Sequence, residues 1–188
     1  MSDEKTIGDR VVLRRYTLDD AEALYRALDA DRATIGRFML WVRKVDSVEK
    51  AHEAIAGWLK ENEEHDSVTL AIDRRGELVG TVFQCHPCRD HLNVEIGYWL
   101  TEAARGEGIA TRATEALLDL TFGEMGFHRA SLKIAPQNEA SIAIAERMGL
   151  EKEGVLRDFW QLEPGVWTDC VVYATTADRW AARKDGAS

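Results

Sequence analysis

The sequence predicts a mixed α/β (α+β) fold, with one central, mostly antiparallel twisted sheet flanked by helices. Two observations predict it. Period-two and period-3.6 segments follow the order strand, two or three helices, three strands, helix, strand, helix, two strands. The three middle strands follow one another without a helix between them, which favours antiparallel neighbours. With 188 residues the chain can bury one substantial core. We therefore expect a single domain over residues 1–188, with short flexible termini.

The first half of the chain is predicted from helix caps and hydrophobic spacing. Thr17 and Asp20 have the spacing of a capping box, and Ser47 stands directly before a run with helical periodicity. The predicted elements are a strand at 10–16, a helix at 17–28, a less regular helical stretch at 35–42 and a helix at 48–64.

The second half is predicted from β-branched runs and glycine stops. Gly76 marks a short turn between two strands, Gly126 is placed to end a helix in a left-handed conformation, and Gly149 closes the next helix. We expect a loop over 85–91, "CHPCRDH". The predicted elements are strands at 67–73, 77–85 and 92–100, a helix at 108–125, a strand at 128–135, a helix at 138–148, and a terminal antiparallel pair at 150–160 and 167–177.

Composition excludes several classes of function. The net charge of −9 argues against a broad surface for nucleic acid or for anionic membranes. No apolar run approaches the roughly 18 to 20 residues needed to span a bilayer, and the start "MSDEKTIGDR" lacks the pattern of a secretory signal. Three cysteines agree with a reducing compartment. We expect a cytoplasmic protein with neither nucleic-acid nor membrane partners.

The stretch "ARGEGIATRAT", 104–114, has the features of an anion site at the start of a helix. Helix N-termini present unpaired amides and the positive end of the macrodipole. Gly106 and Gly108 allow a phosphate to approach the backbone, Arg105 adds a guanidinium, and Ala110 is small. The segment fits neither a Rossmann fingerprint nor a P-loop. Pyrophosphate binding is favoured, and glycines that only shape a tight turn remain the alternative.

The stretch 104–114 and the segments on either side of it resemble a known protein family. "RGEGIA" matches R/Q-x-x-G-x-G/A at Arg105, Gly108 and Ala110, and it resembles the acyl-CoA pyrophosphate motif of the GNAT N-acetyltransferase superfamily. "NVEIGYWL" before it and "APQNEASIAIAERMGL" after it resemble the family's fourth strand and its later strand-to-helix segment. "WTDCVVY", 167–173, is similar to the closing strand of the RimJ/RimL-type branch (ribosomal-protein-alanine/serine acetyltransferase-like). The motifs occur in the family's order.

The resemblance implies acetyl-CoA as cosubstrate. It implies a sheet split by a V-shaped acyl-CoA cleft between the strands 92–100 and 128–134, where the pantetheine arm pairs with backbone as another strand would. Asn138 is expected either to contact the pantetheine or to cap a helix, and the two roles do not exclude each other. The expected acetyl-CoA-binding residues are Gly97, Tyr98, Trp99, Leu100, Arg105, Gly106, Glu107, Gly108, Ile109, Ala110 and Asn138.

The resemblance also implies direct acetyl transfer to an amine, without a covalent enzyme intermediate. This chemistry needs a neutral amine, a donor to the carbonyl oxygen and a proton for the departing thiolate. Ala145 occupies the position of the tyrosine that donates this proton in many members, so Ser141 is the predicted acid; an ordinary first-turn serine is the alternative. Glu95 is the predicted base, and a structural ion pair is its alternative.

Two further alternatives concern metal and activity. Cys85, His86, Cys88 and His91 suggest zinc, but the second ligand pair of a structural site is missing, so no metal is expected. Ala145 allows a catalytically inactive acyl-CoA-binding regulator on the same fold. The leading hypothesis is an N-acetyltransferase whose acceptor is a protein N-terminal amine or a small-molecule amine, with a possible homodimer, as is common among RimL-like proteins.

Overall fold

The computed structural model describes residues 4–186, and its chain divides into two compact units. The first unit holds residues up to Gln84 together with Tyr98–Ala116, and the second holds Cys85–Gly97 and the residues from Leu117 onward. Two strands and one helix contribute residues to both. The single domain expected over 1–188 stays a prediction, and the outermost residues of its predicted flexible termini, 1–3 and 187–188, lie outside the described residues.

Helix caps in the first unit are formed as predicted. The Thr17 amide donates to the Asp20 carboxylate at 2.8 Å in a capping box, and Ser47 Oγ accepts from the Lys50 amide at 3.2 Å. The elements are β1 (Glu4–Gly8), β2 (Val11–Arg15), η1 (Leu18–Asp20), α1 (Ala21–Ala30), α2 (Arg32–Ile35), η2 (Leu40–Lys44), α3 (Val48–His65), β3 (Thr69–Arg74), most of β4 (Glu77–Cys88), the end of β5 (Asn93–Leu100), η3 (Glu102–Ala104) and the start of α4 (Ile109–Phe122).

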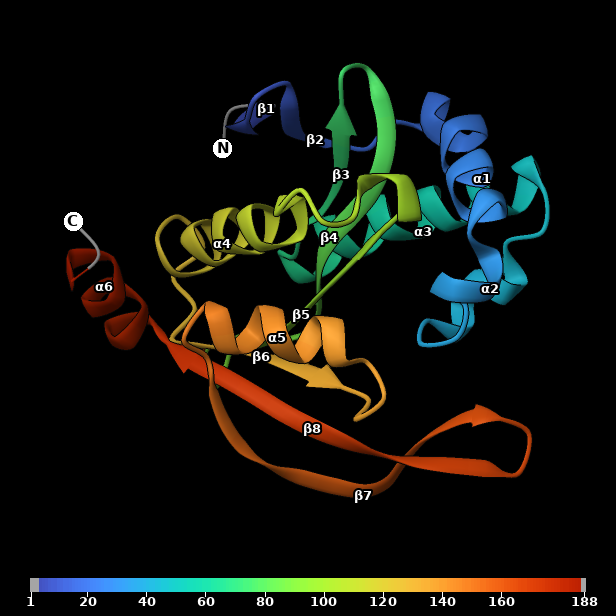
Figure 1. The fold of residues 1–188 in the computed structure, drawn as a ribbon. Helices are drawn as coiled ribbons and strands as arrows, with labels where there is room; N and C mark the ends of the chain where they lie inside the picture. Colours follow the sequence, from blue (N-terminus) through green and yellow to red (C-terminus); the bar gives the residue numbers. More distant parts are fainter. Residues whose placement is uncertain (1–3, 187–188) are drawn as a thin grey trace. The chain divides into compact units, whose positions relative to one another are not determined.

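The core of the first unit lies under α1 and α3, which pack side by side (Figure 1). Leu24, Leu28 and Ile55 are completely buried there. β3 and β4 form a hairpin whose turn residues, Arg75 and Gly76, have φ of +59° and +85°. Positive φ at both positions suits the twist of a two-residue hairpin, so the predicted turn at Gly76 is confirmed.

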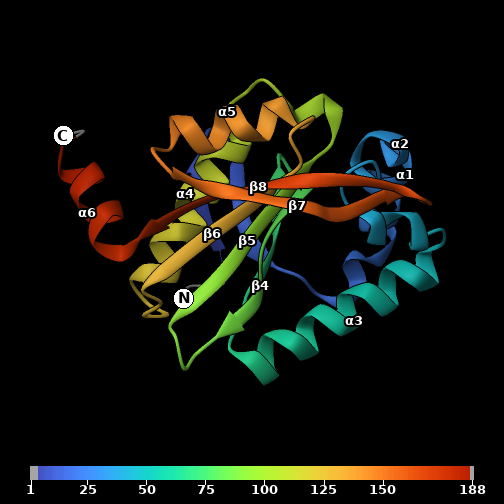
Figure 2. The same cartoon turned by 90° about the horizontal axis from the view of Figure 1, so that it is seen from below.

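The second unit is dominated by a long terminal hairpin. β8 pairs with β6 on one side and with β7 on the other, and α5 lies along these strands (Figures 1 and 2). β6 alternates strictly, with Ala130, Leu132 and Ile134 buried, as expected for a strand that faces the core on one side. The elements are the ends of β4 and α4, the start of β5, and β6 (Arg129–Ile134), α5 (Glu139–Arg147), β7 (Glu151–Glu163), β8 (Val166–Thr176) and α6 (Ala177–Gly186).

The strands form an eight-stranded sheet in the order β1-β2-β3-β4-β5-β6-β8-β7, so the predicted fold class is confirmed. The pairs β1·β2, β2·β3, β3·β4, β6·β8 and β7·β8 are antiparallel, whereas β5·β6 is parallel. The β5·β6 ladder covers Asn93–Glu95 and Arg129–Ser131, while β6 continues to Ile134. This short ladder agrees with the expected splitting of the two strands. The V-shaped cleft itself stays a prediction.

Several predicted boundaries change. The predicted loop over 85–91 is wrong in its first part, because β4 continues through Cys88. The stretch 35–42 is replaced by the short helices α2 and η2. Helix α4 ends at Phe122, and Gly126 has φ +68°, the left-handed conformation predicted for it.

The outermost elements, β1 and α6, have no counterpart in the sequence prediction. β1 has no fully buried residue, and α6 buries only Trp180, so neither gives a hydrophobic pattern. Within residues 4–186, none of the helices has both the length and the apolar composition that crossing a bilayer requires.

Candidate functional site

The predicted anion loop lies between η3 and α4 in the first unit. Residues 105–108 are exposed, whereas Ile109 is buried. Gly106 and Gly108 have φ of +79° and +71°, which glycine adopts without a Cβ penalty. The first hydrogen bond of α4 runs from the Arg112 amide to Gly108 O at 3.1 Å. The amides that precede it have no acceptor inside the helix, so they are available to an anion.

Three arginines surround this loop. Arg105 Nη2 donates to Leu100 O at 3.1 Å, which holds its guanidinium beside the loop. Arg74 Nη1 donates to a Glu107 carboxylate oxygen at 2.6 Å, and Arg112 Nη1 donates to Glu107 O at 3.0 Å. The Glu107 carboxylate is therefore paired with a cation, which lowers its repulsion toward an anion bound at the loop.

Arg74 and Arg112 are absent from the residues predicted from the sequence. A Cβ built on Gly8 would lie 3.0 Å from Arg112 Nε, and one built on Gly108 would lie 3.0 Å from Arg112 Nη1. The guanidinium thus fits between two glycines, and its Nε is buried without a hydrogen-bond partner among the described residues. Arg112 could have been identified as a candidate residue of the anion site, because it lies in the first turn of the helix. Arg74 is 33 residues from Glu107, and no local pattern signals it.

The expected β5 contacts can act through the backbone. Gly97 is partly buried and has no side chain to obstruct a neighbouring chain. The side chain of Trp99 is only 4% exposed and packs in the core of the first unit. A ligand that pairs with Trp99 would therefore meet its main-chain groups rather than its ring.

Asn138 and Ser141 meet at the start of α5 in the second unit. Asn138 Oδ1 accepts from the Ser141 amide at 3.3 Å, so the predicted cap is confirmed. A pantetheine contact of Asn138 stays a prediction. Ser141 is partly buried, and its hydroxyl is not needed for the cap because only its amide takes part. Ala145, one turn further along, is completely buried.

Glu95 forms an ion pair within the second unit. Its Oε2 lies 2.8 Å from Lys133 Nζ, and the two side chains are 18% and 27% exposed. Lys133 Nζ also lies 4.9 Å from the centre of the Phe159 ring. The structural ion pair considered as an alternative is therefore present. The role of Glu95 as base stays a prediction, since a paired carboxylate still offers its second oxygen.

The buried cysteine is unsuited to nucleophilic catalysis. Burial raises the pKa of the Cys170 thiol to about 11, and the side chain is completely buried in β8. The thiolate is the nucleophilic form, so this cysteine is almost entirely unreactive at neutral pH.

Comparison with known proteins agrees with this geometry. The sequence profile of the acetyltransferase (GNAT) domain matches residues 10–151. The uncharacterized N-acetyltransferase YoaA of Bacillus subtilis (strain 168) is 30% identical over 173 residues, which cover 91% of this chain and 96% of that protein.

Two solved structures are similar over nearly the whole chain. The microcin self-immunity acetyltransferase MccE, in complex with acetyl-CoA and AMP, is 26% identical, with a TM-score of 0.86 over 94% of this chain and 97% of that one. The ribosomal alpha-N-protein acetyltransferase RimL, in complex with coenzyme A, is 23% identical, with a TM-score of 0.88 over 94% and 99%. At that identity RimL supports the fold alone.

Proposed function

Since the chain belongs to the GNAT acetyltransferase family, we propose that it transfers the acetyl group of acetyl-CoA directly to a primary amine. The acceptor is a protein N-terminal amine or a small-molecule amine. The names of two similar proteins support these classes: YdaF of Bacillus subtilis (strain 168), 25% identical over 95% of this chain, is a putative ribosomal N-acetyltransferase, and MccE is a microcin self-immunity acetyltransferase. A cytoplasmic location and a homodimer belong to the same proposal. Cell fractionation and sedimentation equilibrium test them.

The loop at the start of α4 is the observation that carries the proposal. It combines amides without intrahelical acceptors, two left-handed glycines and the guanidiniums of Arg74, Arg105 and Arg112. A diphosphate carries negative charge and several acceptor oxygens, which this arrangement matches. The turn-shaping role of the glycines is compatible with binding, because a glycine that shapes the turn also lets a phosphate approach the backbone.

The transfer step is assigned to two side chains of the second unit. A base takes a proton from the acceptor ammonium, the neutral nitrogen attacks the thioester carbonyl, and the C–S bond breaks after the tetrahedral intermediate forms. We assign Glu95 as the base and Ser141 as the donor that protonates the departing thiolate of coenzyme A. The nitrogen loses its second proton as the intermediate collapses, and this proton restores the Ser141 hydroxyl. The buried thiol of Cys170 agrees with transfer that forms no acyl-enzyme.

Glu95→Gln tests the base directly. Glutamine keeps the size of the side chain but accepts no proton. We therefore expect kcat/KM for the amine at neutral pH to fall by about 100-fold and the acidic limb of the pH–rate profile to disappear. Lys133→Met is the matched control, because it also breaks the ion pair but leaves the carboxylate, so an acidic limb is retained. A Glu95→Gln enzyme that keeps the wild-type acidic limb contradicts the assignment.

An acceptor panel tests the activity as a whole. The full-length protein is incubated with acetyl-CoA and either N-terminal peptides or small-molecule amines, and acetylated products are identified by mass spectrometry. We expect turnover on at least one class, with free coenzyme A formed in equal amount. Binding of acetyl-CoA without turnover on any acceptor would favour the inactive regulator that Ala145 suggested. Apart from Ala145, neither the described residues nor the similar proteins named above favour that alternative.

A further inference from the structure

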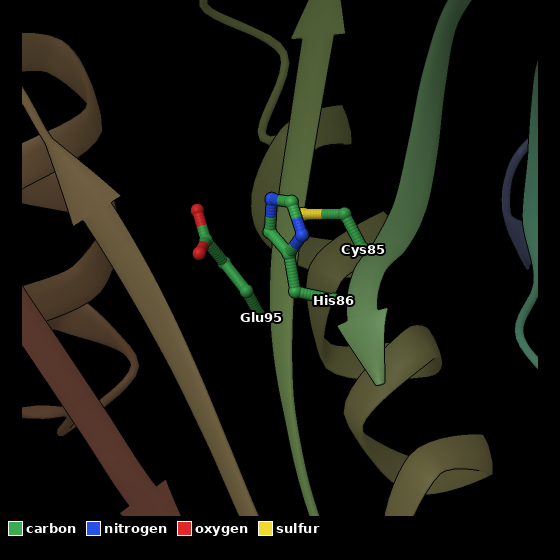
Figure 3. A group of neighbouring side chains, drawn as sticks. All are labelled: Cys85, His86 and Glu95. Atoms are coloured by element: carbon green, nitrogen blue, oxygen red, sulfur yellow. The ribbon is translucent and has the colours of Figure 1, made fainter. Parts of the chain in front are cut away.

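Three side chains that can bind a metal meet in the second unit, where the end of β4 lies near the start of β5. Cys85 and His86 belong to β4 and Glu95 to β5, and the ligand atoms that they offer all lie within 4.8 Å of one another. Figure 3 shows the His86 imidazole between the Cys85 sulfur and the Glu95 carboxylate. Cys85 and His86 also belong to the zinc pattern in the sequence, whereas its other two members, Cys88 and His91, are not part of this group.

The backbone of His86 brings the group together. Successive residues of a regular strand point to opposite faces, so Cys85 and His86 would normally point apart. His86 has φ +52°, a left-handed conformation that non-glycine residues rarely adopt and that persists only where the surroundings hold it. The imidazole consequently lies beside the thiol (Figure 3). Because His86 is exposed and Cys85 partly buried, an ion from solvent can reach both.

We propose that Cys85 Sγ, one imidazole nitrogen of His86 and one carboxylate oxygen of Glu95 bind a single Zn²⁺, with water as the fourth ligand. Zinc takes sulfur, nitrogen and oxygen donors in tetrahedral geometry, and three protein ligands leave one open position. Donors around one tetrahedral zinc lie roughly 3.5 Å apart, so side-chain rotation has to close only a small gap. The thiol proton of Cys85 passes to solvent on binding, because the thiolate is the ligand.

Lys133 limits the affinity of this site. Its ammonium lies 2.8 Å from Glu95 Oε2, which leaves the other carboxylate oxygen for a metal but places a positive charge nearby. Removing that charge therefore strengthens zinc binding. Because the Lys133 charge weakens zinc binding, we expect zinc to bind reversibly rather than to occupy the site permanently.

Zinc at this site inhibits acetyl transfer. Glu95 cannot accept the amine's proton while its free oxygen binds the metal. This consequence rests on the function proposed above, in which Glu95 is the base, whereas the metal site does not. Zinc thus acts as an inhibitor, because it competes with the amine's proton for the Glu95 carboxylate. The transfer itself uses acetyl-CoA without a metal.

Cobalt titration of the full-length protein, without a polyhistidine tag and after chelator treatment, tests the site. Co²⁺ bound to a thiolate in tetrahedral geometry absorbs strongly in the near-ultraviolet and visible regions. We expect one Co²⁺ per chain, displaced by Zn²⁺. Cys85→Ser should lose the thiolate band and bind at least about tenfold more weakly, as expected on loss of a ligand. Lys133→Met should bind about tenfold more tightly.

Cys88→Ser is the matched control, because Cys88 lies on the same strand and is also partly buried. It should keep the thiolate band and the wild-type affinity. No saturable binding, a band that survives in Cys85→Ser, or a band lost in Cys88→Ser would each overturn the site.

The inhibition is measured separately as acetylated product, counted by mass spectrometry because the thiol of coenzyme A itself binds zinc. Each protein is compared with its own rate in chelator. We expect saturating zinc to slow the wild type and Cys88→Ser by at least about tenfold, and Cys85→Ser much less, since loss of a base costs at least that much. Cobalt binding without zinc inhibition overturns the regulatory inference and leaves the site. Absence of any transfer overturns the proposed function, and the cobalt titration still decides the site.

Discussion

Gly108→Val is expected to weaken binding of acetyl-CoA by at least about 100-fold, because about two charge-assisted hydrogen bonds from the loop amides are lost. The φ of +71° at Gly108 is strained for a β-branched residue, so the loop must change shape. The new side chain also covers the amides and crowds Arg112, whose Nη1 would lie 3.0 Å from the added Cβ. Nη1 is the end of a flexible side chain, so it needs to shift by only a few tenths of an ångström. The backbone is therefore the main cause of the loss.

Two variants separate this effect from a general loss of folding. Gly57→Val introduces the same side chain in α3, where a Cβ meets no atom within 4 Å, and it should bind acetyl-CoA as the wild type does. Gly106 also has a strained positive φ, of +79°, but a Cβ there meets no atom within 4 Å, so Gly106→Val should lose affinity without crowding. A thermal unfolding transition first shows that each variant is folded. Calorimetry then measures its affinity for acetyl-CoA. A folded Gly108→Val protein that binds within threefold of the wild type contradicts the role of the loop.

Ser141→Ala is expected to lower kcat by about 100- to 1,000-fold, the range typical for loss of a general acid. The Michaelis constant for acetyl-CoA should change by less than threefold. Folding should be preserved, since the cap from Asn138 uses the amide of residue 141 and alanine favours helix. Steady-state kinetics with a good acceptor from the panel measures both parameters.

Ser141→Thr provides the conservative comparison, because it restores a hydroxyl and should recover part of kcat. Equal losses of kcat and of acetyl-CoA affinity in Ser141→Ala would assign the hydroxyl to binding. No loss would make it an ordinary first-turn residue. Either result removes the acid role, and Ala145, which is completely buried, offers no proton donor in its place.

Local features of the fold are predictable because their causes are local. Thr17, Ser47 and Asn138 each form a hydrogen bond with the residue three positions further along, so a short pattern shows where the helix starts. Gly76, Gly126 and Gly149 all have positive φ, which few other residues tolerate. The loop before α4 is predictable for the same reasons, and family resemblance then assigns its ligand class.

The partners of the site residues are less predictable, because strand register decides them. Lys133 reaches Glu95 only since β5 and β6 pair in parallel with Glu95 opposite Ser131. His86 joins Cys85 only through its left-handed backbone, which no neighbouring glycine or turn pattern announces. The extension of β4 through Cys88 is not predictable, because the segment is rich in residues that favour loops. Arg74 likewise meets Glu107 through tertiary structure alone.

Calorimetric titration of the full-length protein with coenzyme A is the most direct test of the diphosphate site before α4. We expect saturable binding of one molecule per chain, and binding at least about 100-fold weaker for pantetheine, which lacks the diphosphate that we propose the amides and guanidiniums bind. No heat of binding at two well-separated temperatures, or equal affinity for pantetheine and coenzyme A, would contradict the account.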